Sequence, residues 1–231
     1  MSFEERSEAL VELLDELSGR GDPFVLVGGY AVSPFNPRFS TDLDVVVAPP
    51  DTETFDQFLR SRDFERIDSH EKHWRYATAV VEYEKRLAPT RPIGVDLLVN
   101  GLGCRQTEAQ WSFEHLHEHS TARTVSGQTV STETRVVDGS VLVAAKLHSA
   151  RPTDLRDAVA VTAEIDLETV TAHLLRGDEE ALKAQLQRGL EILDSEDFEH
   201  GFRSDFGTSS VQEATVNRLR GYLDERIEEL E

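Results

Sequence analysis

The chain has 231 residues, enough for one large domain or two small ones, and 39% of them are hydrophobic, which excludes a disordered polypeptide. Asp and Glu number 44 against 24 Lys and Arg, so the formal net charge of −20 disfavours ordinary phosphate contacts with nucleic acid. No apolar run approaches the roughly 20 residues of a membrane span, and the single Cys104 excludes an internal disulfide, so we expect a cytoplasmic protein without membrane contact.

The first part of the chain alternates helical and extended patterns. Leucines at helical spacing near the N-terminus favour an acidic amphipathic helix over a signal peptide. The predicted elements are a helix over 3–19, a strand over Phe24–Val27, a Gly28-Gly29 turn, a second helix that begins at Tyr30–Val32 and is limited by Pro34, a strand over Asp42–Val47, a helix from Asp51 or Thr52 to about Arg62, extended segments over 74–99, a helix near 106–119 and a strand near 129–137.

From Ser140 onward the apolar residues recur at three- and four-residue steps, which predicts helices only. These helices are Val141–Ala150, Asp154–Glu164, Leu167–Leu175, Glu179–Leu193 and Val211–Leu230. We therefore predict an α/β (α+β) domain over residues 1–138, followed by a helical C-terminal domain over residues 139–231.

Two carboxylates lie two residues apart on the predicted strand Asp42–Val47. Because alternate residues of a strand share a face, Asp42 and Asp44 should project together, about 6.6 Å apart along the backbone. Carboxylates side by side repel each other unless a cation lies between them, and hard oxygen ligands favour Mg²⁺. The pair thus predicts a two-metal site for phosphoryl chemistry, with a solvated strand edge as the alternative.

The Gly28-Gly29 turn precedes this pair by about a dozen residues. Glycines after a strand let the backbone approach a ligand closely, and free backbone N–H groups at a helix start can bind phosphate. A Gly-Gly turn alone is commonly structural, so the interpretation depends on the combination of strand, turn and Asp-Leu-Asp.

The segment GGYAVSPFNPRFSTDLDVVV resembles the signature of the minimal nucleotidyltransferase superfamily, whose mixed sheet with flanking helices is shared with DNA polymerase β. The resemblance implies that Gly28 and Gly29 bind a triphosphate and that Asp42 and Asp44 ligate two Mg²⁺ ions, which Mn²⁺ could replace. It also implies a third acid on a later strand, which completes the site and accepts the proton of the attacking hydroxyl. Asp96, alone in an apolar stretch, fits that position.

The R-x-S-T-D-L-D motif and the later K-L-H-S-A-R and D-L-x-D motifs resemble motifs of the abortive-infection (AbiEii-type) toxin nucleotidyltransferases. This resemblance implies that Lys146 contacts the triphosphate, with Arg38 and Ser40 beside it, while Asp154 and Asp157 brace nearby basic groups. It further implies a macromolecular acceptor, either tRNA or a protein hydroxyl, and an antitoxin partner.

We therefore expect transfer of a nucleoside monophosphate from an NTP to an acceptor hydroxyl with release of pyrophosphate. Two alternatives stay open, namely a catalytically inactive nucleotide-binding or interaction module and a metal-dependent phosphohydrolase. An RNA acceptor would need a basic track, for which the candidates are Arg75, Lys85, Arg86 and Arg91, unless these residues only pair with nearby acids.

Other residues with metal-binding or nucleophilic side chains receive structural interpretations. The run of His115, His117 and His119 lies in a helical pattern that would scatter the imidazoles around the axis, so a polar surface is expected rather than a metal site. Cys104 has no evident catalytic neighbours in the sequence and is expected to be a passive thiol.

The acidic residues are spread through every segment, and only four of the basic residues are lysines. Dispersed acid with arginine in place of lysine resembles proteins of extreme halophiles; an ordinary acidic protein is the alternative. In molar salt the Debye length is about 3 Å, so the net charge would then say little about partners.

Self-repulsion of this charge predicts that the fold is destabilised at low ionic strength. The melting temperature should rise steadily between about 0.1 M and molar KCl, because screening shortens the range of the repulsion. A scanning-calorimetry series in KCl measures this. A flat or falling curve would remove the halophile interpretation.

Overall fold

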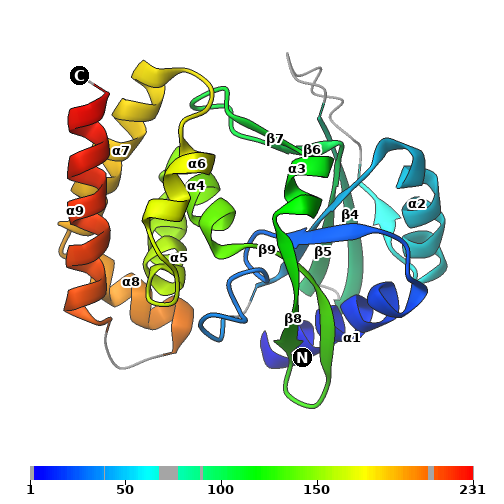
Figure 1. The fold of residues 1–231 in the computed structure, drawn as a ribbon. Helices are drawn as coiled ribbons and strands as arrows, with labels where there is room; N and C mark the ends of the chain where they lie inside the picture. The colour runs from blue at the N-terminus through cyan, green and yellow to red at the C-terminus, as the bar shows by residue number, and fades with distance from the viewer. Residues whose placement is uncertain (1–2, 39, 68–77, 89–90, 208–210, 231) are drawn as a thin grey trace. The chain divides into compact units, whose positions relative to one another are not determined.

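The computed structural model describes residues 3–38, 40–67, 78–88, 91–207 and 211–230 (Figure 1). The chain divides into two compact units, which we call the sheet unit and the helical unit. The sheet unit comprises Met1–Pro34, Phe39–Leu102 and Trp111–Val137, and the helical unit comprises Phe35–Arg38, Gly103–Gln110 and Asp138–Glu231. Two short segments of the first 138 residues thus belong to the helical unit. The division into domains 1–138 and 139–231 stays a prediction.

A seven-stranded mixed sheet forms the sheet unit, in the order β3-β4-β5-β2-β1-β9-β8. Its strands are β1 (Phe24–Val27), β2 (Asp42–Val47), β3 (Glu65–Arg66), β4 (Ala79–Ala88), β5 (Arg91–Val99), β8 (Ser120–Ser126) and β9 (Ser131–Val137). The β2–β5 and β1–β9 pairs are parallel and the other pairs are antiparallel. The predicted mixed sheet is confirmed.

Alternation along β2 gives the sheet one apolar face. Leu43 lies opposite Val95 of β5, which lies opposite Tyr83 of β4, and all three side chains are buried. The Tyr83 hydroxyl donates to Asp56 of helix α2 (Thr52–Ser61) over 2.6 Å, so α2 covers this face. Each fully buried apolar side chain contributes about 1.5–3 kcal/mol relative to exposure.

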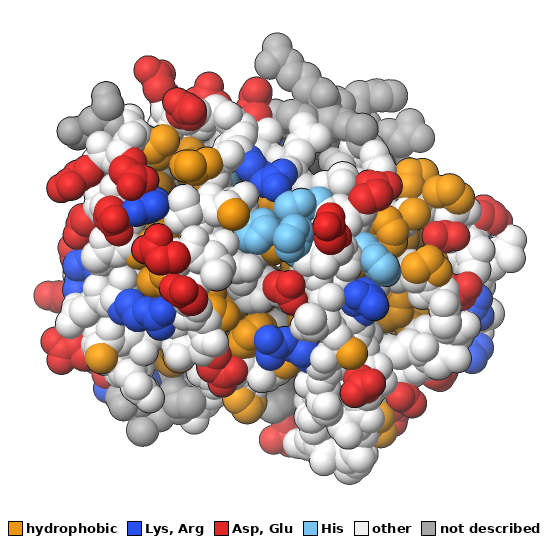
Figure 2. All heavy atoms as spheres, viewed as in Figure 1, with side chains coloured by type: hydrophobic (Ala, Val, Ile, Leu, Met, Phe, Trp, Pro, Cys, Tyr) orange, Lys and Arg blue, Asp and Glu red, His pale blue; other side chains and the backbone are white. Residues whose placement is uncertain are grey.

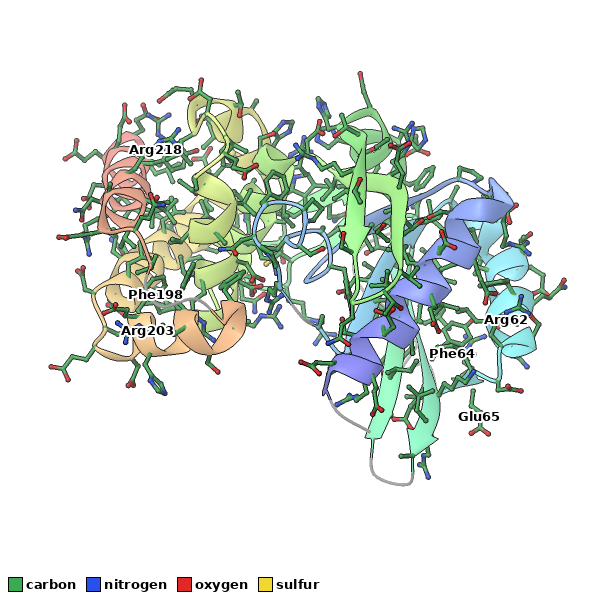
Figure 3. All side chains as sticks on the ribbon, turned by 90° about the horizontal axis from the view of Figure 1, so that it is seen from below. Arg62, Phe64, Glu65, Phe198, Arg203 and Arg218 are labelled. Carbon is green, nitrogen blue, oxygen red and sulfur yellow. The ribbon has the colours of Figure 1, made fainter. Side chains whose placement is uncertain are left out.

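Helix α1 (Phe3–Arg20) lies beside α2, as Figures 1 and 3 show. Glu16 of α1 and Arg62 at the end of α2 form an ion pair of 2.5 Å, and the Arg20 guanidinium lies 4.9 Å from the centre of the Phe58 ring. Because these contacts place both helices on the apolar face, the opposite face of the central strands remains available for polar side chains.

The segment after Gly28-Gly29 corrects one prediction, because Tyr30–Val32 does not begin a helix. The backbone makes two successive turns, in which Val32 donates to the Gly29 carbonyl and Ser33 to the Tyr30 carbonyl, each over 3.2 Å. Proline lacks the N–H that a continuing helix needs and disfavours helical geometry in the preceding residue, so Pro34 stops the helix before it forms.

The predicted helix near 106–119 is also wrong over its first half. A two-stranded sheet of β6 (Gly101–Gly103) and β7 (Gln110–Ser112) precedes the short helix α3 (Phe113–Glu118). The Ser112 hydroxyl caps α3 by accepting from the His115 N–H over 3.2 Å. Two of the three histidines of the H-x-H-x-H run thus lie in a helix, but the expected scattering of the imidazoles is wrong, because the His115 and His119 rings lie 4.5 Å apart.

The described residues after Val137 form six helices of the helical unit. They are α4 (Gly139–Ser149), α5 (Pro152–Thr162), α6 (Glu168–Leu174), α7 (Glu179–Leu193), α8 (Asp197–Phe206) and α9 (Glu213–Glu229). Helix α8 was missed, although Phe198, Phe202 and Phe206 recur at four-residue spacing and are buried (Phe198 is labelled in Figure 3). None of the described helices combines the length and apolar character that a membrane crossing requires.

His148 of α4 connects three parts of the helical unit. Its Nε2 donates to the Leu174 carbonyl over 2.8 Å, so its Nδ1 accepts from the Thr107 hydroxyl at 2.6 Å and the imidazole is neutral. Burial lowers the pKa of His148 to about 4, because a charged imidazolium would lose its hydration.

This shift predicts acid sensitivity of the helical unit. Unfolded histidine binds a proton near pH 6.5 but His148 does so only near pH 4, so stability present above pH 6.5 is lost as the pH falls towards 4, by at most about 3 kcal/mol. His148→Gln should lower the free energy of unfolding at pH 7 but flatten its slope between pH 6.5 and 4. Urea unfolding at several pH values measures this, with the exposed His200→Gln as control. Equal slopes in both variants would contradict the assignment.

Candidate active site

Three carboxylates lie on one face of the sheet, on the two central parallel strands. The register of β2 and β5 places Asp44 directly beside Asp96, and Asp42 shares their face because it lies two residues before Asp44. Neighbouring strands lie about 4.8 Å apart, so the carboxylates are within reach of a common cation. The structure therefore brings the three predicted metal ligands together.

The Gly28-Gly29 turn begins at the edge of this group. Strand β1 pairs with β2 so that Val27 lies opposite Asp44, and the next residue is Gly28. Gly28 has a φ of +68°, and a Cβ added to it would lie 1.9 Å from Oδ2 of Asp44. Both the backbone conformation and the space taken by the carboxylate therefore require glycine at this position.

Tyr30 fixes the segment that joins the turn to β2. Its buried hydroxyl donates to the Ser40 carbonyl and shares a hydrogen bond with the Ser7 hydroxyl of α1, each over 3.1 Å. Ser40 in turn accepts at its hydroxyl from the Asp42 N–H over 3.5 Å. Burial raises the pKa of Tyr30 to about 12, so the phenol stays a hydrogen-bond donor. In the sequence, only the position of Tyr30 directly after Gly28-Gly29 indicates that it could anchor this segment.

A further acid extends the carboxylate row onto β4. Glu82 lies opposite Asp96 across the β4–β5 pair and therefore shares its face. Burial raises the pKa of Asp96 to about 6, and the charges of Asp42 and Glu82 raise it as well. An oxygen-only donor set whose members repel one another fits Mg²⁺ or Mn²⁺, which bind carboxylates and phosphate oxygens together.

Arg38 and Lys146 lie in the helical unit, within a cluster of ion pairs. Lys146 Nζ lies 2.8 Å from Oδ1 of Asp154 and 2.7 Å from Oδ2 of Asp157. Arg38 Nε lies 3.0 Å from Oδ1 of Asp157, and Arg151 Nε lies 2.6 Å from Oδ2 of Asp154. We call these five residues the ion cluster.

The two aspartates keep Lys146 charged inside the protein. Burial alone would lower the pKa of Lys146, but the charges of Asp157 and Asp154 outweigh it and the pKa is raised. For Asp154, burial is likewise outweighed, first by the charge of Lys146, and the pKa falls to about 2. The bracing of basic groups by both aspartates that the sequence implied is therefore present.

The prediction that Lys85 belongs to a basic track beside the carboxylates is wrong. It pairs with Ile93 and so points to the apolar face, where its ammonium lies 5.8 Å from the centre of the Phe64 ring and 3.9 Å from Asp63. Side chains alternate between the two faces along β4, so Lys85 points away from the face that carries Glu82 and its partner Asp96.

The other members of the track give it little support. Arg86 is exposed and forms an ion pair with Glu84 of 3.2 Å, which matches the alternative of local charge pairing. Arg75 and the side chain of Arg91 lie outside the described residues. Figure 2 shows acidic side chains scattered over the visible surface rather than gathered in one patch.

Comparison with known proteins supports the fold. The structure resembles the antibiotic-resistance factor ANT(2'')-Ia with a TM-score of 0.51 and 12% sequence identity, over 73% of this chain and 90% of that chain. A protein of H. pylori provisionally described as a nucleotidyltransferase gives a TM-score of 0.46 and 15% identity, over 99% of this chain and 94% of that chain. MenT4, a nucleotidyltransferase toxin of Mycobacterium tuberculosis, gives 0.42 and 14% identity, over 100% of this chain and 85% of that chain.

No protein-family model and no curated protein matches the sequence. At such low identity, the likeness to ANT(2'')-Ia shows the fold that the two proteins share and nothing finer. The two lower-scoring likenesses carry no further argument.

The raised pKa of Asp96 predicts that this residue destabilises the metal-free protein at neutral pH. Its native pKa is about 6 while the unfolded value is near 4, so its unfavourable contribution appears as the pH rises from 4 through 6. Asp96→Asn should raise the free energy of unfolding at pH 7.5 by about 1–2 kcal/mol after allowance for partial exposure, and by almost nothing at pH 4.

Chemical unfolding in EDTA at several pH values measures this difference, with the exposed Glu12→Gln of α1 as control. Added Mg²⁺ should reverse the order, because ligand binding stabilises only the protein that binds it. A wild type more stable than Asp96→Asn in EDTA at pH 7.5 would contradict the assignment.

Proposed function

We propose that the protein is a Mg²⁺-dependent nucleotidyltransferase, which transfers a nucleoside monophosphate from an NTP to an acceptor hydroxyl and releases pyrophosphate. One observation carries the proposal: Asp42, Asp44 and Asp96 share one sheet face beside the Gly28-Gly29 turn. A carboxylate row of this kind is unfavourable without cations, and the fold alone gives no reason to keep it.

Asp42, Asp44 and Asp96 would hold the metal ions, with Mn²⁺ as a substitute for Mg²⁺. When bound, these ions neutralise the triphosphate and lower the pKa of the acceptor hydroxyl. The acids themselves supply only oxygen ligands, in keeping with the preference of Mg²⁺.

The chemistry is an in-line displacement at the α-phosphorus. The acceptor oxygen forms the new P–O bond, the bond between the α-phosphorus and the bridging oxygen breaks, and pyrophosphate leaves with the electron pair. The hydroxyl proton would pass to the Asp96 carboxylate. The other side chains act mainly through positioning and charge.

The triphosphate would bind to the backbone of Gly28 and Gly29 and to Ser40, all in the sheet unit. Triphosphate contacts of Arg38 and Lys146 remain a prediction from the sequence resemblance. Two ion pairs use two of the three N–H donors of Lys146, which leaves capacity for one phosphate oxygen. The ion pairs with Asp154 and Asp157 fix the positions of the two cations within the helical unit.

For the acceptor, the described residues favour a protein hydroxyl over tRNA. Glu82 and Glu84 lie on the same face as Asp96, and they would repel an RNA backbone. The toxin role and the antitoxin partner remain predictions from the sequence resemblance.

The test measures pyrophosphate release and the fate of an α-labelled NTP in Mg²⁺. Asp42→Asn and Asp44→Asn should each lower the rate by at least about 100-fold, because each removes charge needed in the transition state. Asp51→Asn, at the start of α2, should keep the wild-type rate. Wild-type rates in both ligand variants would refute the site.

The products separate the alternatives. Release of orthophosphate or nucleoside monophosphate would favour the phosphohydrolase, and tight Mg-NTP binding without turnover would favour the inactive module.

The acceptor is identified by incubation with each labelled NTP, total RNA and cell lysate. We expect the label on protein. Label on RNA that is lost in Arg86→Glu but kept in the exposed Arg188→Glu of α7 would instead establish the basic track and an RNA acceptor.

A further inference from the structure

Gly94 occupies an unusual place for a glycine, in the middle of β5 and two residues before Asp96. Glycine within a strand loses backbone entropy and gives no side chain to pack, so an interior position needs a reason. The backbone supplies none, since Gly94 is not among the described residues with positive φ. Its neighbours Ile93 and Val95 are buried on the opposite face and would pack the same way beside an alanine.

The space beside Gly94 is filled by the carboxylate of Asp42. The two residues are direct partners in the parallel β2–β5 pair. A Cβ at position 94 would lie 2.3 Å from Oδ1 of Asp42 and 3.2 Å from its Cγ, closer than real Cβ atoms come to such an oxygen. The Asp42 carboxylate therefore occupies the space that a side chain at position 94 would take. We call this space the seat of the carboxylate.

One hydrogen bond to the Asp42 carboxylate and one between the two backbones support this position. The Thr41 hydroxyl donates to Oδ2 of Asp42 over 3.0 Å, on the side away from the oxygen that faces Gly94. The Gly94 N–H donates to the Thr41 carbonyl over 3.0 Å, which fixes the backbone of both strands at this point. Asp42 itself is exposed, so without the seat its short side chain could rotate into solvent.

We propose that Gly94 is a positioning residue, which seats the Asp42 carboxylate over the sheet so that it acts together with Asp44 and Asp96. The role in metal binding depends on the proposed function, whereas the seat itself does not. Gly28 does the same for Asp44, but there the positive φ requires glycine in any case. At position 94, among the described residues, only the Asp42 carboxylate explains why a glycine is present.

The first test is Gly94→Ala, with Mn²⁺ affinity measured by electron paramagnetic resonance and melting temperature measured in EDTA. Displacement of one ligand should weaken Mn²⁺ binding by about 10- to 100-fold. The melting temperature should stay the same or rise, because Asp42 can turn aside and alanine suits a strand better than glycine. Gly19→Ala in α1, where a Cβ has open space, should leave Mn²⁺ affinity unchanged.

A double-mutant cycle with Asp42→Ala separates this role from a purely structural one. In the Asp42→Ala background, Gly94→Ala should cause no further loss of Mn²⁺ affinity. In EDTA, it should raise the melting temperature more than it does in the wild type, because no carboxylate has to be displaced.

Equal changes of melting temperature in the two backgrounds would overturn the seat, and so would an unchanged Mn²⁺ affinity in Gly94→Ala. A wild type that fails to bind Mn²⁺ would refute the proposed function instead. The metal-free cycle would then still decide whether Gly94 positions Asp42.

Discussion

Repulsion among carboxylates on one sheet face is the constraint on which the rest of the sheet unit depends. The parallel pairing of β2 and β5 places Asp44 beside Asp96, and a slip of one residue would turn these acids into the core. The buried partners Leu43 and Val95 on the opposite face prevent that slip, because they would be exposed by the same movement. The apolar face under α2 thus fixes the geometry of the polar one, and the hydrophobic effect supplies the free energy that holds like charges together.

Small residues and one phenol complete this arrangement. Gly28 and Gly94 leave the space in which the carboxylates of Asp44 and Asp42 lie, so room for both carboxylates comes from missing side chains directly after β1 and within β5. Tyr30 acts differently, because its buried hydroxyl ties the segment before β2 to α1 through hydrogen bonds to Ser40 and Ser7. A site on strands is held more precisely than one on loops, and the three carboxylates of the proposed site all lie on strands.

The sequence predicted elements well where one physical signal was strong. The bounds of β1, β2 and α7 agree with the structure because continuous apolar runs or helical periodicity end at clear breakers. Asp42 and Asp44 could be placed on one face from alternation alone, but their closeness to Asp96 needed the resemblance, since pairing between distant strands is not encoded locally. For the same reason the seat at Gly94, the anchor at Tyr30 and the direction of Lys85 were missed, as each depends on a partner far away in the chain. Helix α8 was different, because its phenylalanines carried a readable period.

The dispersed charge and the carboxylate row respond to different ions. Screening in molar salt acts beyond about 3 Å, so it removes the long-range repulsion among exposed acids of the surface. Asp44 and Asp96 lie on strands about 4.8 Å apart and are partly buried, and such pairs are screened much less. Monovalent salt can therefore stabilise the fold without relieving the repulsion within the row. Relief there needs a cation that contacts several carboxylates at once, so the predicted response of the surface to salt and the proposed binding of a divalent metal at the site are physically separate.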